Sequence, residues 1–272
     1  MLPWLTVLIL AGGYLGYVIV LYLTQARFVY KPRRTLARTP AALGLGYEEV
    51  TLRTDDGIDL HGWFLPSEDA RATVLYLHGN VGNIADALEQ AQMLHGLGLA
   101  VLLFDYRGYG RSPGVTTESG TYRDAEAAWA HLTRERGVAP ERVLLYGHSL
   151  GGPIAAWLAG RHRPAGVILE GTFTTFPEMA AAHFPLIPAR WLVRYRYPTR
   201  EYLREVQSPV LIIHSRDDAV APLAEADELF GAIRHALKER LEIAGPHDGA
   251  ALLSRDTVIP AIEGFVARHL TP

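Results

Sequence analysis

The Gly-His-Ser-Leu-Gly stretch at 147–151 constrains the fold more than any other part of this chain. An apolar run at 143–146 precedes it, and an Ala-rich segment at 154–160 follows it. This order predicts a buried strand, a very sharp turn and a helix. Backbone segments approach each other closely in such a turn, and Gly147 and Gly151 lack the Cβ atoms that would clash there.

The stretch predicts that Ser149 stands at the tip of the turn with its hydroxyl exposed. The amide N–H of Leu150 is then expected to point toward the position of a developing oxyanion. A glycine-rich turn without chemistry fits the same short pattern, so the choice between that turn and a nucleophile elbow depends on the rest of the chain.

Composition narrows the classes of protein. A chain of 272 residues suffices for one domain of about 240 residues and an appendage. Cysteine is absent, which excludes disulfides, thiolate metal sites and a cysteine nucleophile. The net charge of −3 gives no overall attraction to nucleic acid. No His-Glu-x-x-His or comparable ligand spacing occurs, so we expect neither a metal nor an organic cofactor.

Residues 1–26 predict a membrane anchor. No charged residue occurs from Leu2 to Ala26, and about 20 apolar helical residues span the core of a bilayer. Trp4 and Tyr22 lie near the two ends, where interfacial aromatic residues collect. A cleaved signal peptide would begin with a basic segment, which this chain lacks. The remaining alternative is a buried helix of a soluble domain.

Residues 27–46 are predicted to form a basic juxtamembrane linker before a domain at 47–272. The linker carries five basic residues and no acidic one: Arg27, Lys31, Arg33, Arg34 and Arg38. By the positive-inside rule, these charges predict a single-pass membrane protein whose domain is cytoplasmic. A solvated linker with no bearing on orientation is the alternative.

Strands and helices alternate through the domain. A β-hairpin is expected at 49–65, around the Asp-Asp-Gly turn at 55–57. Further strands are expected at 72–77, 99–104, 143–146, 166–169, 210–214 and 240–243, with helices at 85–97, 117–136, from 154 onward, 223–236 and 257–270. This pattern predicts a mostly parallel sheet with helices on both faces. Sites in such sheets lie at the carboxyl ends of the strands.

Residues suited to nucleophilic catalysis follow several of these strands. Ser149 follows the strand at 143–146, Asp217 and Asp218 follow 210–214, and His247 follows 240–243. The order Ser, Asp, His is that of α/β-hydrolases and differs from the chymotrypsin and subtilisin orders. The glycine-rich loop at 78–83 also follows a strand, and we expect the backbone N–H of Asn80 to be the second oxyanion donor.

Over residues 47–270 the chain resembles the α/β-hydrolase superfamily. The matching pieces are Leu-His-Gly-Asn at 77–80, Asp-Tyr-Arg-Gly-Tyr-Gly-Arg-Ser at 105–112, Gly-His-Ser-Leu-Gly at 147–151, Ile-His-Ser-Arg-Asp-Asp-Ala-Val at 213–220 and Gly-Pro-His at 245–247. The chain is similar to the branch with one N-terminal membrane anchor and a short cap. Members of that branch act on acyl esters and thioesters, including lipid and protein-palmitoyl substrates.

The resemblance implies the α/β-hydrolase fold and a triad of Ser149, His247 and Asp218. The family pattern around the acid is His-Gly-x-x-Asp-x-x-Val or one residue shorter. Counting four from His214 selects Asp218, and Asp217 is then a turn or cap residue. Ser215 stands where the family usually has Gly, and Pro246 where it usually has a small residue. Glu170, at the end of the strand before the cap, is the other candidate acid.

Residues 172–207 interrupt the alternation and are predicted to form a short cap over the site. Aromatic residues and arginines are interleaved there. Either the aromatic residues pack on the core with the arginines in solvent, or the cap is a membrane-facing lid that admits an acyl chain from the bilayer surface. Such a mixture can also bind single-stranded nucleic acid, but the net negative charge and the anchor argue against that partner.

The sequence therefore predicts a membrane-anchored serine hydrolase that cleaves ester or thioester bonds of a small-molecule or lipid acyl substrate. An aminopeptidase is one alternative, although it needs acidic residues in the cap to hold an α-amino group, and this cap is rich in arginine. A non-catalytic membrane scaffold is the other, and the complete set of triad residues argues against it.

Overall fold

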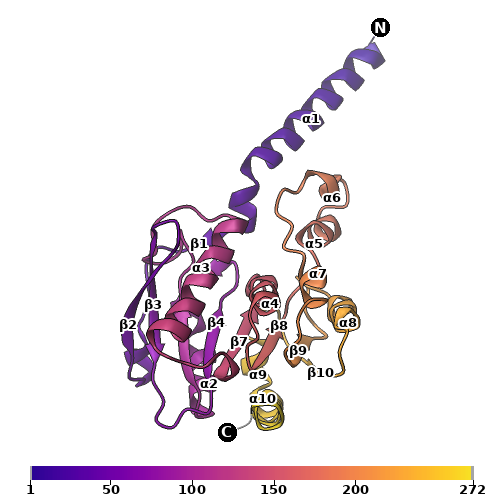
Figure 1. The fold of residues 1–272 in the computed structure, drawn as a ribbon. Helices are drawn as coiled ribbons and strands as arrows, with labels where there is room; N and C mark the ends of the chain where they lie inside the picture. Colours follow the sequence, from indigo (N-terminus) through magenta and orange to yellow (C-terminus); the bar gives the residue numbers. More distant parts are fainter. Residues whose placement is uncertain (1, 271–272) are drawn as a thin grey trace.

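The protein is a long helix attached to a domain in which helices cover both faces of one sheet (Figure 1). This computed structural model describes residues 2–270. Met1 of the predicted anchor and Thr271 and Pro272 of the predicted domain lie outside the described residues. The eight strands lie in the order β10-β9-β8-β7-β4-β6-β3-β2. The β2–β3 and β3–β6 pairs are antiparallel and the other pairs are parallel, which confirms the predicted sheet.

The strand bounds follow the apolar runs of the sequence. The main sheet contains β2 (Glu48–Arg53), β3 (Asp59–Leu65), β4 (Thr73–Leu77), β6 (Ala100–Phe104), β7 (Val143–His148), β8 (Gly166–Glu170), β9 (Val210–Ser215) and β10 (Lys238–Ile243). Every residue of β4, β6, β8 and β9 is buried, because helices cover the sheet on both sides. In the edge strand β2, Val50 and Leu52 are buried and alternate with exposed residues.

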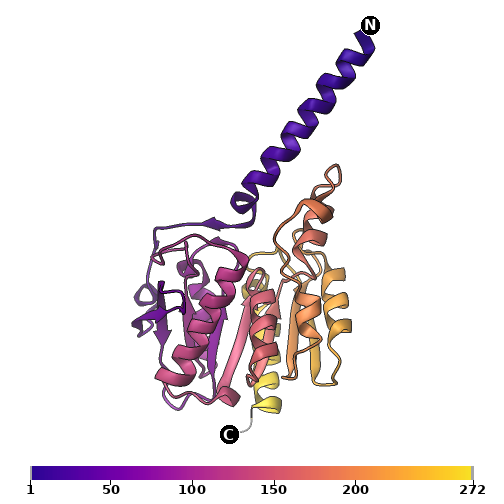
Figure 2. The same ribbon diagram turned by 45° about the horizontal axis from the view of Figure 1, so that its top comes forward.

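The helices form two layers. α3 (Glu118–Ala130), α4 (Gly151–Arg161) and α8 (Leu223–Ala232) pack on one face of the sheet, and α2 (Leu88–Gly96), α9 (Ala250–Leu253) and α10 (Arg255–His269) pack on the other (Figure 2). Because successive strand residues point to opposite faces, Leu75 and Leu77 belong to the first core and Val74 and Tyr76 to the second.

The structure corrects several element bounds. The helix expected at 117–136 begins after its N-cap Thr117 and changes to a π-helix at His131–Glu135. The helix expected at 223–236 ends at Ala232, and the last strand begins at Lys238. Short 3₁₀ turns occur at η1 (Pro40–Leu43), η2 (Ile84–Ala87) and η4 (Pro140–Arg142).

The N-terminal helix α1 (Leu2–Val29) projects away from the domain (Figures 1 and 2). Its 28 residues extend for about 42 Å. Within the described residues it is the helix long and apolar enough to cross a membrane, with a mean hydropathy of 2.1 over its most apolar window. None of that window is buried in the protein, so α1 is not a core helix.

The segment at 27–46 is held along the surface of the domain. Its strand β1 (Lys31–Pro32) pairs in parallel with β5 (Val81–Gly82). Tyr30 is buried, and the Arg33 guanidinium lies 2.9 Å from the Asp86 carboxylate. The segment predicted as a linker therefore connects α1 to the domain through specific contacts.

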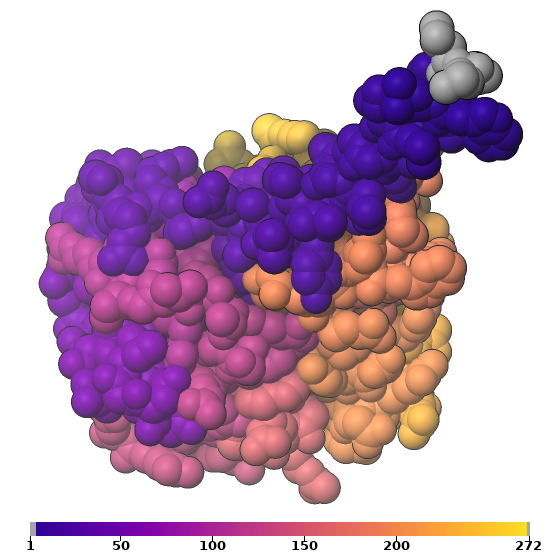
Figure 3. Space-filling view, turned by 90° about the horizontal axis from the view of Figure 1, so that it is seen from above, coloured from indigo at the N-terminus to yellow at the C-terminus, as the bar shows by residue number. Residues whose placement is uncertain are grey.

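The cap at 172–207 contains α5 (Phe176–His183), α6 (Ala189–Leu192) and α7 (Thr199–Leu203). At its base, Phe173 and Tyr197 are buried in the core, as the first interpretation of the cap expected. At its tip, Leu186 is 86% exposed and Trp191 is 88% exposed. Figure 3 shows the cap beside the lower part of α1, and the Tyr14 hydroxyl of α1 donates to the Leu186 carbonyl at the tip.

A buried ion pair joins three parts of the domain. Arg107, in the loop after β6, donates from Nε to Asp124 Oδ1 of α3 at 2.8 Å and from a terminal nitrogen to Asp56 Oδ2 at 2.7 Å. The Asp124 side chain is fully buried, and burial raises its pKa to about 6 although Arg107 acts in the opposite direction. The pair therefore depends on both partners being present.

Replacing Arg107 by alanine leaves the Asp124 carboxyl buried without its partner. We expect Arg107→Ala to lower the free energy of unfolding by about 3–5 kcal/mol, measured by urea unfolding in detergent. The control is Arg53→Ala, which removes the exposed pair with Asp59 and should cost less than about 1 kcal/mol. Equal losses in the two variants would contradict this account.

Candidate active site

Ser149 lies in a strained turn between β7 and α4. Its φ is +50°, a left-handed backbone conformation that residues other than glycine rarely adopt. Neighbouring segments hold the turn: the Ser149 N–H donates to the Glu170 carbonyl at 2.9 Å, and the Thr172 hydroxyl donates to the Ser149 carbonyl at 2.9 Å. The end of β8 therefore fixes the position of the Ser149 side chain.

The flanking glycines permit this turn, as the sequence predicts. A Cβ on Gly147 would lie 2.5 Å from the carbonyl oxygen of Gly151. A Cβ on Gly151 would overlap the carbonyl oxygen of Leu77 at the end of β4. Both positions therefore exclude a side chain, because backbone of β4 and α4 occupies the space.

Ser149, His247 and Asp218 form one hydrogen-bonded chain. The Ser149 hydroxyl lies 2.9 Å from Nε2 of His247, and Nδ1 of His247 lies 2.6 Å from Oδ2 of Asp218. Oδ1 of Asp218 accepts from the N–H groups of Val220 and Ala221, each at 2.8 Å. The structure thus brings together the three residues that the sequence singled out, from the ends of β7, β9 and β10.

The environment of the pair favours a charged Asp218 beside His247. Burial disfavours the imidazolium, but the hydrogen bond and the negative charge of Asp218 outweigh it, so the pKa of His247 lies above its ordinary 6.5. Burial also acts to raise the pKa of Asp218, but the His247 hydrogen bond and the two backbone donors lower it below its ordinary range. Asp218 can therefore stabilise positive charge on the imidazole.

The other candidate acids have other partners. Asp217 accepts from the Gly245 N–H at 3.0 Å, which fixes the loop that carries His247. Glu170 is buried and accepts from the Tyr146 hydroxyl at 2.7 Å and from the Gln90 amide at 2.8 Å. Its carboxylate thus belongs to a buried polar network beneath the site, and Asp218 is the acid that contacts His247.

The two residues predicted to supply the oxyanion donors lie near Ser149, since Leu150 follows it in the chain and Asn80 lines the same cavity. Leu150 begins the turn into α4, and Asn80 lies in the loop after β4, where Gly79 packs against Ser149 and His148. Neither the Asn80 N–H nor the Leu150 N–H donates a hydrogen bond to another described residue. Both donors remain available for a ligand.

The Asn80 loop is held by the segment after α1. The Asn80 side-chain amide donates to the Val29 carbonyl at 2.8 Å. The main-chain carbonyl of Asn80 accepts from the Lys31 N–H at 2.9 Å and from the Tyr109 hydroxyl at 2.8 Å. The sequence did not predict these supports, because Val29 and Lys31 are about fifty positions from Asn80 and no local pattern joins them.

A polar cavity of about 300 Å³ adjoins Ser149. Its lining includes Asn80, His148, Gln90, Arg33, Asp86 and Asp248. Nε2 of His148 is buried and has no hydrogen-bond partner among the described residues. A ring nitrogen of His78 contacts the carbonyl of Gly79 at 2.7 Å, and a ring nitrogen of His214 contacts the carbonyl of Ala221 at 2.7 Å.

One group of side chains near the site has the spacing of metal ligands. A ligand atom of each of His148, His247 and Asp248 lies within 4.8 Å of the others. Both ring nitrogens of His247 already contact Asp218 and Ser149. A cation at this position would therefore compete with the Ser149 contact for the imidazole.

Comparison with known proteins gives relatives over most of the chain. A family model described as serine aminopeptidase, S33, matches residues 68–202. An uncharacterized protein of Mycobacterium tuberculosis is 34% identical over 92% of this chain and 90% of its own length. An uncharacterized membrane protein of Saccharomyces cerevisiae is 32% identical over 92% and 93%. The Arabidopsis thaliana alpha/beta hydrolase domain-containing protein WAV2 is 32% identical over 75% and 74%.

Solved structures share the fold at lower sequence identity. The Pyrococcus furiosus esterase Pf2001 superposes with a TM-score of 0.74 at 20% identity, over 89% of this chain and all of that one. An alpha-beta hydrolase of Vibrio vulnificus gives 0.72 at 22% identity, over 85% and 88%. With the sheet order, the sharp turn at Ser149 and the relatives above, these matches lead to one conclusion: the chain belongs to the α/β-hydrolase superfamily.

Proposed function

We propose that this protein is a membrane-anchored serine hydrolase that cleaves ester or thioester bonds of acyl substrates through an acyl-enzyme on Ser149. The observation that carries the proposal is the hydrogen-bonded chain from Ser149 through His247 to Asp218, beside two unused backbone N–H groups. A serine hydroxyl needs a neighbouring base before it becomes an effective nucleophile, and this geometry supplies one.

In the proposed reaction, His247 Nε2 accepts the Ser149 proton as Oγ attacks the carbonyl carbon of the substrate. The tetrahedral intermediate collapses, and its C–O or C–S bond breaks as His247 returns the proton to the departing alcohol or thiol. Water then attacks the acyl carbon and loses a proton to His247. The bond from the acyl carbon to Ser149 Oγ breaks as His247 returns that proton to Oγ, which releases a carboxylic acid and free Ser149. Asp218 keeps the imidazole in the required tautomer and stabilises its charged form.

The N–H groups of Asn80 and Leu150 are the proposed oxyanion donors. The charge on the carbonyl oxygen grows during attack, so donors already directed toward it stabilise the transition state more than the substrate. Asn80 is well suited because its own carbonyl and side chain are held by Lys31, Tyr109 and Val29. The loop therefore needs little rearrangement when the oxyanion forms.

Two further features support a membrane-bound acyl substrate. α1 has the length and hydropathy of a membrane span, and apolar side chains at the tip of the cap are exposed beside it. The five basic residues after α1 support a cytoplasmic position for the domain. Reporter fusions to the C-terminus test that orientation, and activity of an exported-side reporter would overturn it.

An aminopeptidase is the second candidate, because the matching family model carries that description. It would need a free carboxylate near Ser149 to hold an α-amino group. Asp248 is exposed in the polar cavity, whereas Asp86 is paired with Arg33. Aminoacyl p-nitroanilides distinguish the two candidates, since only an aminopeptidase should hydrolyse them faster than the matching p-nitrophenyl esters.

Removing the Ser149 hydroxyl should abolish the nucleophilic route. We expect the wild-type protein to hydrolyse a series of p-nitrophenyl esters and Ser149→Ala to be slower by about three orders of magnitude or more. Ser112→Ala is the matched control, because Ser112 is a buried serine outside the site. Equal turnover by wild type and Ser149→Ala would refute the proposed nucleophile.

The proposed base also predicts a pH profile. A general base acts in its neutral form, and Asp218 raises the pKa of His247, so the acid limb of kcat/KM should lie above pH 6.5. In Asp218→Asn, the burial that lowers the pKa of His247 remains, but the negative charge that raises the pKa of His247 is lost. The acid limb should therefore move to lower pH, and kcat should fall by about four orders of magnitude.

Asp217→Asn is the control for this experiment, since Asp217 bonds Gly245 and not His247. Its acid limb should stay at the wild-type pH. A shift in Asp217→Asn as large as that in Asp218→Asn would count against the assignment of Asp218.

A further inference from the structure

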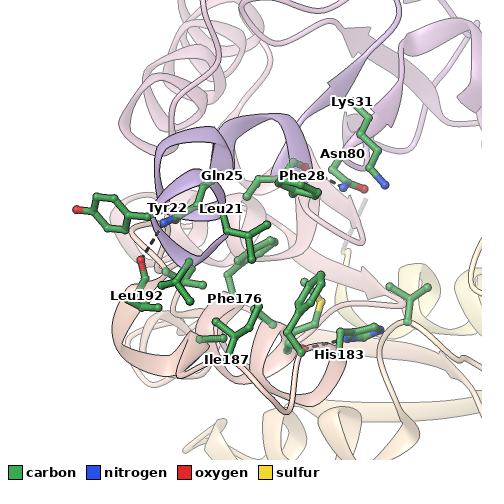
Figure 4. Close-up of a pocket in the computed structure, with 18 residues that line it drawn as sticks. Leu21, Tyr22, Gln25, Phe28, Lys31, Asn80, Phe176, His183, Ile187 and Leu192 are labelled. Atoms are coloured by element: carbon green, nitrogen blue, oxygen red, sulfur yellow. Dashed lines mark hydrogen bonds between the residues drawn. The ribbon is translucent and has the colours of Figure 1, made fainter. Parts of the chain in front are cut away.

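An apolar groove separates α1 from the cap. Its volume is about 310 Å³, and its walls come from the last third of α1, from α5 and α6, and from the loop that carries Asn80 (Figure 4). In Figure 4, Leu21 on α1 faces Phe176 and Ile187 of the cap, and Asn80 lies at one end of the groove. The groove is thus formed by the anchor and the hydrolase domain together.

One face of α1 forms the wall. Its lining residues recur at the spacing of a helical face: Val18, Leu21, Tyr22, Gln25 and Phe28. From Val18 to Phe28 this wall extends for about 15 Å along the helix. Leu23, two residues from Leu21, is 68% exposed and is not part of the lining. Of these two leucines in the same helix turn, Leu21 lines the groove and Leu23 does not.

Polar contacts fix the spacing of the two walls. Gln25 donates to the Leu192 carbonyl at 2.9 Å and accepts from the Arg194 N–H at 2.9 Å. Higher along the helix, the Tyr14 hydroxyl donates to the Leu186 carbonyl at 2.8 Å. The Gln25 side-chain amide is thereby satisfied by the backbone of the cap. The cap is bound to the anchor along about three turns of α1.

The groove ends at the proposed oxyanion donor. Asn80 lines both this groove and the polar cavity that contains Ser149. Val220, whose N–H donates to Asp218, also lines the groove. An ester carbonyl placed between Ser149 and the Asn80 N–H would therefore have an apolar channel on one side and a polar cavity on the other.

We propose that this groove binds the fatty acyl chain of the substrate, which enters laterally from the bilayer, and that α1 is a wall of the substrate site as well as an anchor. The inference rests on the proposed function, because it assigns the acyl part of that substrate to the groove and the leaving group to the polar cavity. Leu186 and Trp191, each next in sequence to a residue of the lining, are exposed apolar side chains suited to contact with lipid chains.

The test uses alkyl fluorophosphonates, which label the nucleophilic serine directly and need no turnover. Full-length protein in phosphatidylcholine vesicles is treated with an ethyl or a hexadecyl probe, and the labelling rate of Ser149 is measured. Leu21→Trp fills the groove and Leu23→Trp places the same side chain on the exposed face. We expect Leu21→Trp to slow hexadecyl labelling by about tenfold or more, with ethyl labelling unchanged.

Leu23→Trp should label like wild type with both probes. Unchanged hexadecyl labelling in Leu21→Trp would overturn the groove as the chain site. An equal loss with both probes in Leu21→Trp would also overturn it, because the residue would then support the triad and not the chain. Failure of the proposed function has a different signature: labelling at Ser149 by the ethyl probe without hydrolysis of any ester.

Discussion

The left-handed backbone of Ser149 is the constraint on which the site depends. That conformation persists because β4, β8 and α4 surround the turn, and because glycine at 147 and 151 lets their backbones meet. The same packing directs the Ser149 hydroxyl toward His247 and leaves the Leu150 N–H unpaired. A parallel sheet buried on both faces provides the rigid frame, since the ends of β7, β9 and β10 meet at one edge.

Much of this arrangement could be predicted from local sequence patterns. Predicted strands of four to six residues identified the parallel strands, and the residue after each strand has to lie at the same edge of the sheet. That is why Ser149, Asp218 and His247 could be grouped before any coordinates were known; their catalytic roles stay a proposal. The choice of Asp218 over Asp217 came from family resemblance, and the His247 contact agrees with it.

Other features depend on tertiary contacts that leave little trace in sequence. The helix expected to reach 236 ends at Ala232 because Ile233 leaves the helical conformation and is buried. The basic segment at 27–46 looks like a linker by composition, yet β1 pairs with β5 and Arg33 pairs with Asp86. The wall on α1 could not be predicted because apolar residues occur on every face of that helix, and the polar residue Gln25, which contacts the cap, carries no signal of its partner.

The bonds from Asn80 to Val29 and Lys31 make α1 and the loop of the proposed oxyanion donor one mechanical unit. A membrane helix adjusts its tilt to the thickness of the surrounding bilayer. In the proposed membrane-anchored enzyme, the lower end of α1 is joined to the loop without a flexible spacer, so a change of tilt acts on the side chain and the main-chain carbonyl of Asn80. Bilayer thickness would therefore act on the proposed site, and a fragment that begins after Val29 would lose that connection along with one partner of the loop.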